Sequence, residues 1–440
     1  MRSNFSAVLR RAASLALVFI LTLSALWLLL AAAAAIPNDA IRANMEKSAL
    51  HYAEREPFSF ASEGRWNTVA DNYADAILLG VAWNMGIDGA LNTRYNDGGE
   101  LGENAGLFLA VTQGDPANTD YTRYWHGMCA PVRLLLLITD VAGIKLAGFL
   151  AILALAAVSI VLLIQKKHIP LAVMLAAALA AVHIWNARLA MEYQPGFLVA
   201  LAMLPLWLTL ERRSDAWLTR LAVIAGVCIA FFDFLTTETL SILLPLILIV
   251  YIREKEGRLG SARSALLQLI ACGGAWLAAY AGTFLAKWIA VSAVTGENMF
   301  APALSGAAER IGGAMQNGIE SPRTVFSPIT ANFTQIFTAG DRVEYAKTLL
   351  ALAGMALIFV SVWYLLRADT GHRNAALLIL ALGMLVPLRY IVMNNHSFLH
   401  SFFTYRALAS TLLAAMAALW LSIRVGGKQP KREMRQRRRK

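Results

Sequence analysis

Two carboxylates stand four residues apart in the segment Asp71-Asn72-Tyr73-Ala74-Asp75. On a helix this spacing places both side chains on one face, where they can act together. A carboxylate pair can provide a general base with a supporting acid, or ligands for a divalent metal. The structural alternative is that Asp71 caps a helix while Asp75 is solvated. Both carboxylates are therefore candidate catalytic residues.

A second group of chemically versatile side chains occupies residues 120–127, where Arg123, Tyr124, Trp125 and His126 follow one another. Arg presents a fixed fork of donors that suits a phosphate. Aromatic rings beside it suit the face of a sugar. The four residues are candidates for binding a sugar-phosphate, and the structural alternative is an aromatic belt with an Arg anchor at a membrane interface.

Near the C-terminus, His396 and His400 precede Tyr405 and Arg406. The two His residues have a spacing that could bind metal, yet two ligands do not complete a site. Phosphate contacts from His and Arg are the preferred interpretation, with a polar hairpin rim as the structural alternative. All four residues are candidates for binding the substrate or its carrier phosphate.

Three further ionisable residues, Glu192, Asp233 and Glu238, stand beside apolar runs. Ionisable groups at that depth of a membrane are costly and usually functional, although each side chain could extend to the interface instead. Glu192 therefore joins the candidate binding residues. All the candidates fall on one side of the membrane in the topology that hydropathy and charge predict.

Common cofactor motifs are missing from the sequence. It contains no phosphate-binding GxxxxGK[ST] motif, no GxGxxG at the start of a helix and no HExxH. Its three cysteines, Cys129, Cys228 and Cys272, are far apart and form no CxxC motif. We therefore assign no certain cofactor, leave a divalent metal open, and expect an energised substrate to arrive already activated.

The elements that must position these residues are membrane helices. Of 440 residues, 58% are hydrophobic and only 15% are charged, whereas soluble domains have about 45–50% apolar and about 25% charged residues. Much of the formal charge of +11 lies in the tail 427–440, which follows a hydrophobic run. Such a tail meets anionic lipid headgroups or acts as a topogenic signal, so nucleic acid is not an expected partner.

Hydropathy predicts an all-α, polytopic transmembrane helix bundle with about ten spans, since a spanning helix needs about 20 mostly apolar residues. The apolar runs are 12–36, 143–164, 169–186, 197–210, 221–236, 239–252, 265–290, 347–366, 375–393 and 406–423. If the N-terminus is inside, the interior segments contain 23 of the 39 Lys and Arg residues but only 6 of the 28 Asp and Glu residues. Positive charge marks cytosolic loops, so both termini are predicted to be cytosolic.

One transmembrane domain, 1–426, accounts for nearly the whole chain, and 427–440 forms a basic cytosolic tail. The domain has two long exterior loops, 37–142 and 291–346. The first apolar run is about 25 residues long, whereas the apolar core of a signal peptide has about 7–15. We therefore expect a retained first helix.

Two spans, 197–210 and 239–252, are well below the usual length of a membrane helix. Irregular backbone below the bilayer surface is tolerated only where protein or a water-filled cavity surrounds it. The segments 188–195 and 233–238 are therefore expected to line an outward-facing depression.

This pattern resembles the GT-C class of membrane glycosyltransferases, which take sugars from polyprenyl-phosphate carriers at the exterior face. The shared features are a long first exterior loop with acidic residues, a similar number of spans, and polar clusters on one face. Locally, residues 71–75, 124–127, 395–397 and 403–406 resemble motifs of uncharacterised bacterial membrane proteins related to that class.

The resemblance implies that Asp71 or Asp75 is the catalytic base and that Arg123, His126 and Arg406 bind the carrier phosphate. It implies an inverting-type transfer from a polyprenyl-phosphate-sugar donor to a glycan or lipid acceptor, in the bacterial plasma (inner) membrane among membrane lipids. The chain lacks the large soluble C-terminal exterior domain of many oligosaccharide-transferring members. A small glycan or lipid acceptor therefore fits better than a folded protein.

Three other functions are compatible with the same residues. A polysaccharide polymerase or ligase would share the exterior chemistry and the carrier lipid. A transporter or flippase of a lipid-linked saccharide would place ionisable groups near the bilayer midplane and show paired halves, which this sequence does not. A non-catalytic assembly subunit would use its exterior loops to bind partners.

Overall fold

The computed structural model describes residues 2–62, 64–233, 235–312, 324–337 and 371–422, together with parts of 353–367. Helices dominate, and the described strands form only two short antiparallel pairs, as expected for the predicted all-α membrane fold. Parts of the predicted loop 291–346 and of the predicted span 347–366, and all of the tail 427–440, lie outside the described residues.

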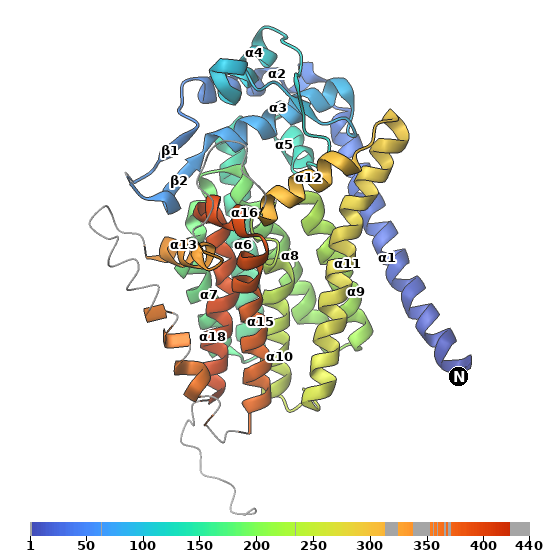
Figure 1. The fold of residues 1–440 in the computed structure, drawn as a ribbon, viewed down its shortest axis with the longest axis vertical. Helices are drawn as coiled ribbons and strands as arrows, with labels where there is room; N and C mark the ends of the chain where they lie inside the picture. The colour runs from blue at the N-terminus through green and yellow to red at the C-terminus, as the bar shows by residue number, and fades with distance from the viewer. Residues whose placement is uncertain are drawn as a thin grey trace, which may run out of the picture.

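A bundle of long helices forms the body of the molecule (Figure 1). Its helices are α1 (Arg2–Ala34), α6 (Val141–Gln165), α7 (Ile169–Ala181), α8 (Pro195–Leu210), α9 (Asp215–Phe232), α10 (Leu240–Lys255), α11 (Ala262–Thr295), α15 (Arg373–Val392) and α18 (Leu408–Ser422). Among the described residues, seven helical stretches are long and apolar enough to cross a membrane. The chain is therefore a multi-pass membrane protein, and the exposed apolar side chains on α1 and α11 indicate contact with lipid.

The sequence predicts about ten spans, whereas seven helical stretches in the described residues are long and apolar enough to cross a membrane. Three of the predicted spans account for the difference. Helices α7 and α10 match two of the predicted spans but have only 13 and 16 residues. At 1.5 Å per residue, α7 is roughly 20 Å long, shorter than the hydrocarbon core of a bilayer. The third, 347–366, lies partly outside the described residues.

Basic residues from three helix connections meet at one end of the bundle. Buried Glu211, at the end of α8, accepts Lys166 at 3.5 Å and Arg258 at 2.6 Å. Arg212 and Glu256 approach within 3.2 Å beside them. The sequence predicts that all three connections are cytosolic. In the structure, their ion pairs lie at one end of the bundle.

Two helix pairs in the bundle approach each other closely at glycines. A Cβ on Gly226 of α9 would lie 2.4 Å from the Trp276 carbonyl oxygen of α11. A Cβ on Gly383 of α15 would lie 2.5 Å from the Ala414 Cβ of α18, where Thr411 also donates to the Gly383 carbonyl at 2.8 Å. Close approach of small residues is how membrane helices gain packing energy. These contacts make the bundle a rigid support.

A helical cap covers the end of the bundle opposite to the N-terminus (Figure 1). It comprises α2 (Asn38–Ala53), β1 (Phe58–Phe60), η1 (Trp66–Thr68), β2 (Val69–Asp71), α3 (Asn72–Asp88), β3 (Arg94–Tyr95), η2 (Gly99–Leu101), α4 (Gly102–Thr112), β4 (Thr119–Asp120) and α5 (Cys129–Leu135). The predicted exterior loop 37–142 is therefore an ordered helical unit.

The fully buried Arg133 of α5 fastens the cap to α1. Its guanidinium donates to the Ala33 carbonyl at 2.8 Å, to the Ala82 carbonyl at 2.5 Å and to the Ile36 carbonyl. Ala33 lies in the last turn of α1, where helix carbonyls lack intrahelical partners, and Ile36 follows the end of the helix. The cation also offsets the negative end of the helix dipole.

Short elements connect the cap and the bundle. They are η3 (Ile184–Arg188), η4 (Met191–Tyr193), α12 (Phe300–Ile311), α13 (Ser327–Ile336), α16 (Asn394–Leu399), α17 (Ser401–Thr404) and η6 (Tyr405–Ala407). Asn67 of the cap donates to the Gln335 carbonyl at 2.9 Å and accepts from Asn186 on its own carbonyl at 2.9 Å. These bonds fix the cap against the elements that carry the candidate site.

Candidate active site

Asp71 stands where a strand becomes a helix. It is the last residue of β2, pairs with Phe58 of β1, and caps α3 by accepting the Ala74 N–H at 2.9 Å. The side chain is 4% exposed. The cap bond uses only Oδ1, which leaves the other carboxylate oxygen for a second interaction. The predicted capping role of Asp71 is therefore compatible with a catalytic one.

Asp75 is buried rather than solvated, and neighbours hold both its oxygens. Tyr52 donates to Oδ2 at 2.7 Å, Lys145 donates to Oδ2 at 3.3 Å, and the Met191 N–H donates to Oδ1 at 2.7 Å. These three donors fix the position of the Asp75 carboxylate. Asp75 therefore orients the segment that follows Met191.

Glu192 belongs to that segment, and its carboxyl group hydrogen-bonds to the Asp71 carboxyl group. The pKa of Asp71 is raised to about 7, mainly by burial and also by the negative charge of Asp75, while the bonds from Ala74 and Glu192 oppose the rise. Two carboxyl groups this close tend to share a proton. The arrangement gives Asp71 a pKa close to neutrality.

Arg406 completes this cluster from the far end of the sequence. Its guanidinium carbon lies 4.1 Å from the centre of the Tyr193 ring, next to Glu192 in the chain. Tyr193 in turn donates to the Val69 carbonyl of β2 at 3.1 Å, two residues before Asp71. Asp71, Glu192 and Arg406 are therefore brought together from three distant segments.

The guanidinium of Arg406 is 1% exposed and has donors to spare. Nη1 donates to the Phe402 carbonyl at 3.3 Å, but Nε and Nη2 have no hydrogen-bond partner in the described part of the chain. No carboxylate among the described residues lies within ion-pair distance of it. Buried charged donors without partners are costly, so a ligand with acceptor oxygens would find them ready.

Tyr405 and the two His residues line the same region but are already engaged. The Tyr405 hydroxyl lies 3.2 Å from His183 Nδ1 in the core. His396 Nε2 lies 2.9 Å from the Leu235 carbonyl, and the His396 and His400 rings are 4.8 Å apart. Burial lowers the pKa of His400 to about 4, so it is neutral at physiological pH.

Arg389 and Glu238 form a buried ion pair that sequence reasoning did not connect. Arg389 of α15 donates to Glu238 at 2.7 Å, to Ser397 at 3.0 Å and to the Leu235 carbonyl at 2.6 Å. The pair holds Leu235 and Glu238 of 233–238, one of the two segments expected to line a depression. The same segment also packs closely against Gly196 of α8, where an added Cβ would overlap the Thr237 hydroxyl.

The segment 120–127 divides between the surface and the core. Arg123 lies over the rings of Tyr121, at 4.9 Å, and Tyr124, at 5.1 Å. Trp125 is buried, donates to the Thr283 carbonyl at 2.7 Å and stacks on Phe231. Its contacts are those of a packing residue.

His126 takes the left-handed conformation with φ of 54° and lies 2.8 Å from the Tyr121 carbonyl through Nε2. Burial lowers the pKa of His126 to about 3, so the imidazole is uncharged. It can therefore donate a hydrogen bond but supplies no positive charge to a phosphate.

Some site residues carried no sequence signal. Tyr193, Tyr52 and Lys145 hold the carboxylates in place, yet each looks like an ordinary aromatic or basic residue in its segment. Arg389 did carry a signal, because it is an ionisable residue inside an apolar run. Within the described ranges, no group of three or more His, Cys, Asp or Glu side chains is arranged to hold a metal ion.

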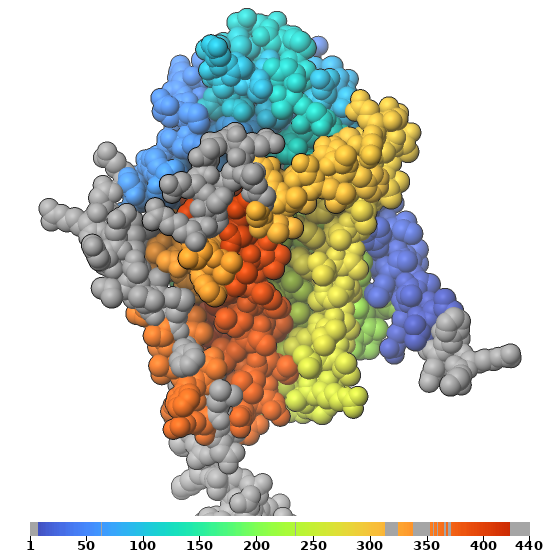
Figure 2. Space-filling model, in the orientation of Figure 1, coloured from blue at the N-terminus to red at the C-terminus, as the bar shows by residue number. Residues whose placement is uncertain are grey.

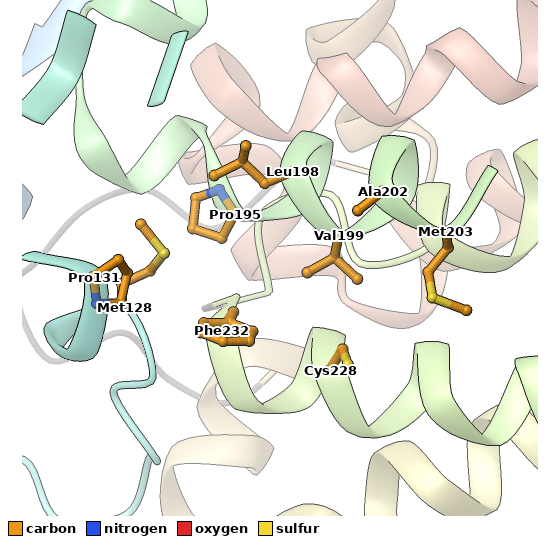
Figure 3. A pocket seen from close by; sticks show the side chains of 9 residues that line it. All are labelled: Met128, Pro131, Pro195, Leu198, Val199, Ala202, Met203, Cys228 and Phe232. Atoms are coloured by element: carbon orange, nitrogen blue, oxygen red, sulfur yellow. The ribbon is translucent and has the colours of Figure 1, made fainter. Parts of the chain in front are cut away.

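An apolar cavity of about 260 Å³ lies between α8, the end of α9 and the start of α5 (Figure 3). It is lined by Met128, Pro131, Pro195, Leu198, Val199, Ala202, Met203, Cys228 and Phe232. Pro195 stands three residues after Glu192, and the α8 residues continue along one face of that helix into the bundle. A space of this composition suits a hydrocarbon chain.

Comparison with known proteins gives no relative: no protein-family model, curated protein or solved structure matches this chain. Its function must therefore be argued from the carboxylate cluster, the guanidinium beside it and the apolar cavity.

Proposed function

We propose that this protein is a membrane glycosyltransferase that moves a sugar from a polyprenyl-phosphate carrier to a glycan or lipid acceptor at the exterior face of a bacterial inner membrane. The observation that carries the proposal is the juxtaposition of Asp71 and Glu192 with the unpaired guanidinium of Arg406. One side of this cluster can take a proton, and the other can hold a phosphate.

Asp71 is the proposed general base. A base works best when its pKa lies near the working pH, and burial gives Asp71 a pKa of about 7. Asp71 accepts the proton of the acceptor hydroxyl while that oxygen bonds to the anomeric carbon of the sugar. Glu192 hydrogen-bonds to the Asp71 carboxyl group, and Asp75 fixes the segment that carries Glu192.

Arg406 is the proposed phosphate anchor. As the bond between the anomeric carbon and the phosphate oxygen breaks, the electron pair leaves on that oxygen, and the guanidinium stabilises the charge. Arg suits this role because it stays charged and offers a planar fork of donors. The Tyr193 ring packs against one face of the Arg406 guanidinium and fixes its orientation.

The apolar cavity supports a lipid-linked donor. A polyprenyl chain must stay in an apolar environment while its phosphate reaches the polar cluster. The cavity along α8 begins three residues from Glu192, so the two ends of such a molecule would each meet matching surroundings.

The test uses Arg406→Lys and Arg406→Gln in purified full-length protein with a photoreactive polyprenyl phosphate. Lys keeps the charge but loses the fork, and we expect about tenfold weaker labelling; Gln should lose about a hundredfold, in line with about 1.5–3 kcal/mol per charge-assisted bond. Arg42→Gln, an exposed Arg of the cap, is the matched control. Undiminished labelling of Arg406→Gln would exclude Arg406 as the phosphate anchor.

A further inference from the structure

Two arginines from distant segments share one aromatic ring. Arg123 lies 5.1 Å and Arg310 lies 5.7 Å from the centre of the Tyr124 ring. Arg123 comes from the loop that follows β4 in the cap, and Arg310 comes from the last turn of α12. Both side chains are half-buried.

The two guanidinium groups also face a common gap. A Cβ built on Gly306 would lie 3.1 Å from Nη1 of Arg310 and 3.9 Å from Nε of Arg123. These two nitrogens therefore lie at most about 7 Å apart. One tetrahedral oxyanion can accept hydrogen bonds from two guanidinium groups at that separation.

In the described part of the chain, neither guanidinium has a carboxylate within ion-pair distance. Within the described ranges, the ion pairs of the structure include neither Arg123 nor Arg310, and Arg123 Nε is buried without a hydrogen-bond partner. The aromatic faces of Tyr121 and Tyr124 compensate only part of the repulsion between like charges. Asp120 acts on Arg123 from a greater distance.

Helix α12 has the character of a helix at a membrane surface. It lies across the junction of the cap and the bundle (Figures 1 and 2), and its apolar Leu304 and Ile311 are 60% and 51% exposed. Gly306 and Arg310 lie one helical turn apart, Arg310 Nη1 donates to the Gly306 carbonyl at 2.7 Å, and a Cβ on Gly306 would approach Arg123 of the cap. An amphipathic helix of this kind lies at the level of lipid headgroups.

We propose that Arg123 and Arg310, spaced by Gly306 and seated on Tyr124, form a second anion site that binds a phosphate group, in the form of a lipid headgroup. The site stands on its geometry alone. We further infer that its ligand is the acceptor of the transfer, and this step rests on the proposed function. A monophosphate carrier has only one phosphate, which binds at Arg406, so a second phosphate must belong to another molecule.

Gly306 supplies the critical variant. Gly306→Ala adds a methyl group 3.1 Å from Arg310 Nη1, in the gap between the two guanidinium groups. Because Ala favours a helix more than Gly does, the variant should fold at least as well as the wild type. Gly274→Ala is the matched control, since a Cβ at Gly274 of α11 meets nothing within 4 Å.

The experiment measures the thermal unfolding of purified full-length protein in detergent against increasing dihexanoyl phosphatidic acid, with dihexanoylglycerol as the compound lacking phosphate. We expect saturable stabilisation by the phosphatidic acid only. Gly306→Ala and Arg310→Gln should weaken it about tenfold or more, the loss of one charge-assisted hydrogen bond, while Gly274→Ala should leave it unchanged.

Inorganic phosphate is the second probe. Stabilisation by inorganic phosphate that is also lost in Gly306→Ala would support the anion site and assign it to free phosphate. Equal affinity of the wild type, Gly306→Ala and Arg310→Gln for both phosphate compounds would overturn the proposal, as would the absence of any stabilisation. No sugar donor is present in this experiment, so a failed transferase assay would leave this result unaffected.

Discussion

Replacing Asp71 by Asn should make the protein more stable and inactive at the same time. Asn is as good a helix cap as Asp, so the bond from Ala74 is retained. What the substitution removes is the buried negative charge. Active sites often hold groups that destabilise the fold, and removing such a group exchanges activity for stability.

The size of the effect follows from the pKa of Asp71. That pKa is about 7 in the folded protein, against 3.8 for an unperturbed carboxyl group. A difference of one pKa unit corresponds to about 1.4 kcal/mol, so the ionised side chain lowers the free energy of unfolding by about 4 kcal/mol at pH 8. Because the pKa is raised in the folded state, the wild type has its full free energy of unfolding below pH 4. It loses the 4 kcal/mol progressively as the pH rises from about 4 through 7.

The assay is the difference in melting temperature between Asp71→Asn and the wild type, measured from pH 4.5 to pH 8.5. The variant should gain about 4 kcal/mol at pH 8, about two fifths of that at pH 5, and about a quarter of it at pH 4.5. Asp88→Asn, at an exposed position in the last turn of α3, serves as the control and should show no such trend. A difference that does not change with pH, or a loss of stability at pH 8, would refute the burial of an ionised Asp71.

Three other outcomes are expected. Transfer activity should fall about tenfold between pH 8 and pH 6, because only the ionised Asp71 accepts a proton; a flat profile excludes it as the base. Arg133→Met should lower the free energy of unfolding by about 3 kcal/mol and expose the end of α1 to protease, since three carbonyls lose their donor; unchanged protease resistance would contradict that role. A cysteine at exposed Gln113 should react with an impermeant thiol reagent from outside intact cells, and one at exposed Ser214 should not; labelling at Ser214 would reverse the predicted orientation.

The membrane character and the grouping of the basic connections could be predicted because both depend on average properties of long segments. Hydropathy over a span and the sign of loop charges do not depend on how helices pack. The same rules do not define where a helix begins and ends. The helix α7 ends at Ala181, before the predicted end at 186, where buried irregular backbone begins, whereas α10 continues three residues beyond its predicted end at 252.

The candidate site was predictable where chemistry alone singled out a residue. Asp71, Glu192 and Arg406 are unusual in their surroundings, so type and position sufficed to select them. Their partnership was not predictable, because it depends on the contact of Arg406 with Tyr193 and on the bond between Tyr193 and Val69. Arg310 gave no signal, since an Arg at the end of a short helix is usually solvated, and only its place beside Gly306 distinguishes it.

The wide separation of Asp71 and Arg406 along the chain governs when the protein can first act. During synthesis, Asp71 emerges early with the cap, whereas Arg406 precedes the last helix of the bundle, α18. Contacts between segments this far apart can form only after the intervening helices have been inserted. A ribosome-bound or truncated chain that ends before α15 therefore holds its carboxylates without the guanidinium beside them. Under the proposed function, newly made protein should therefore stay inactive until insertion of the last helices is complete.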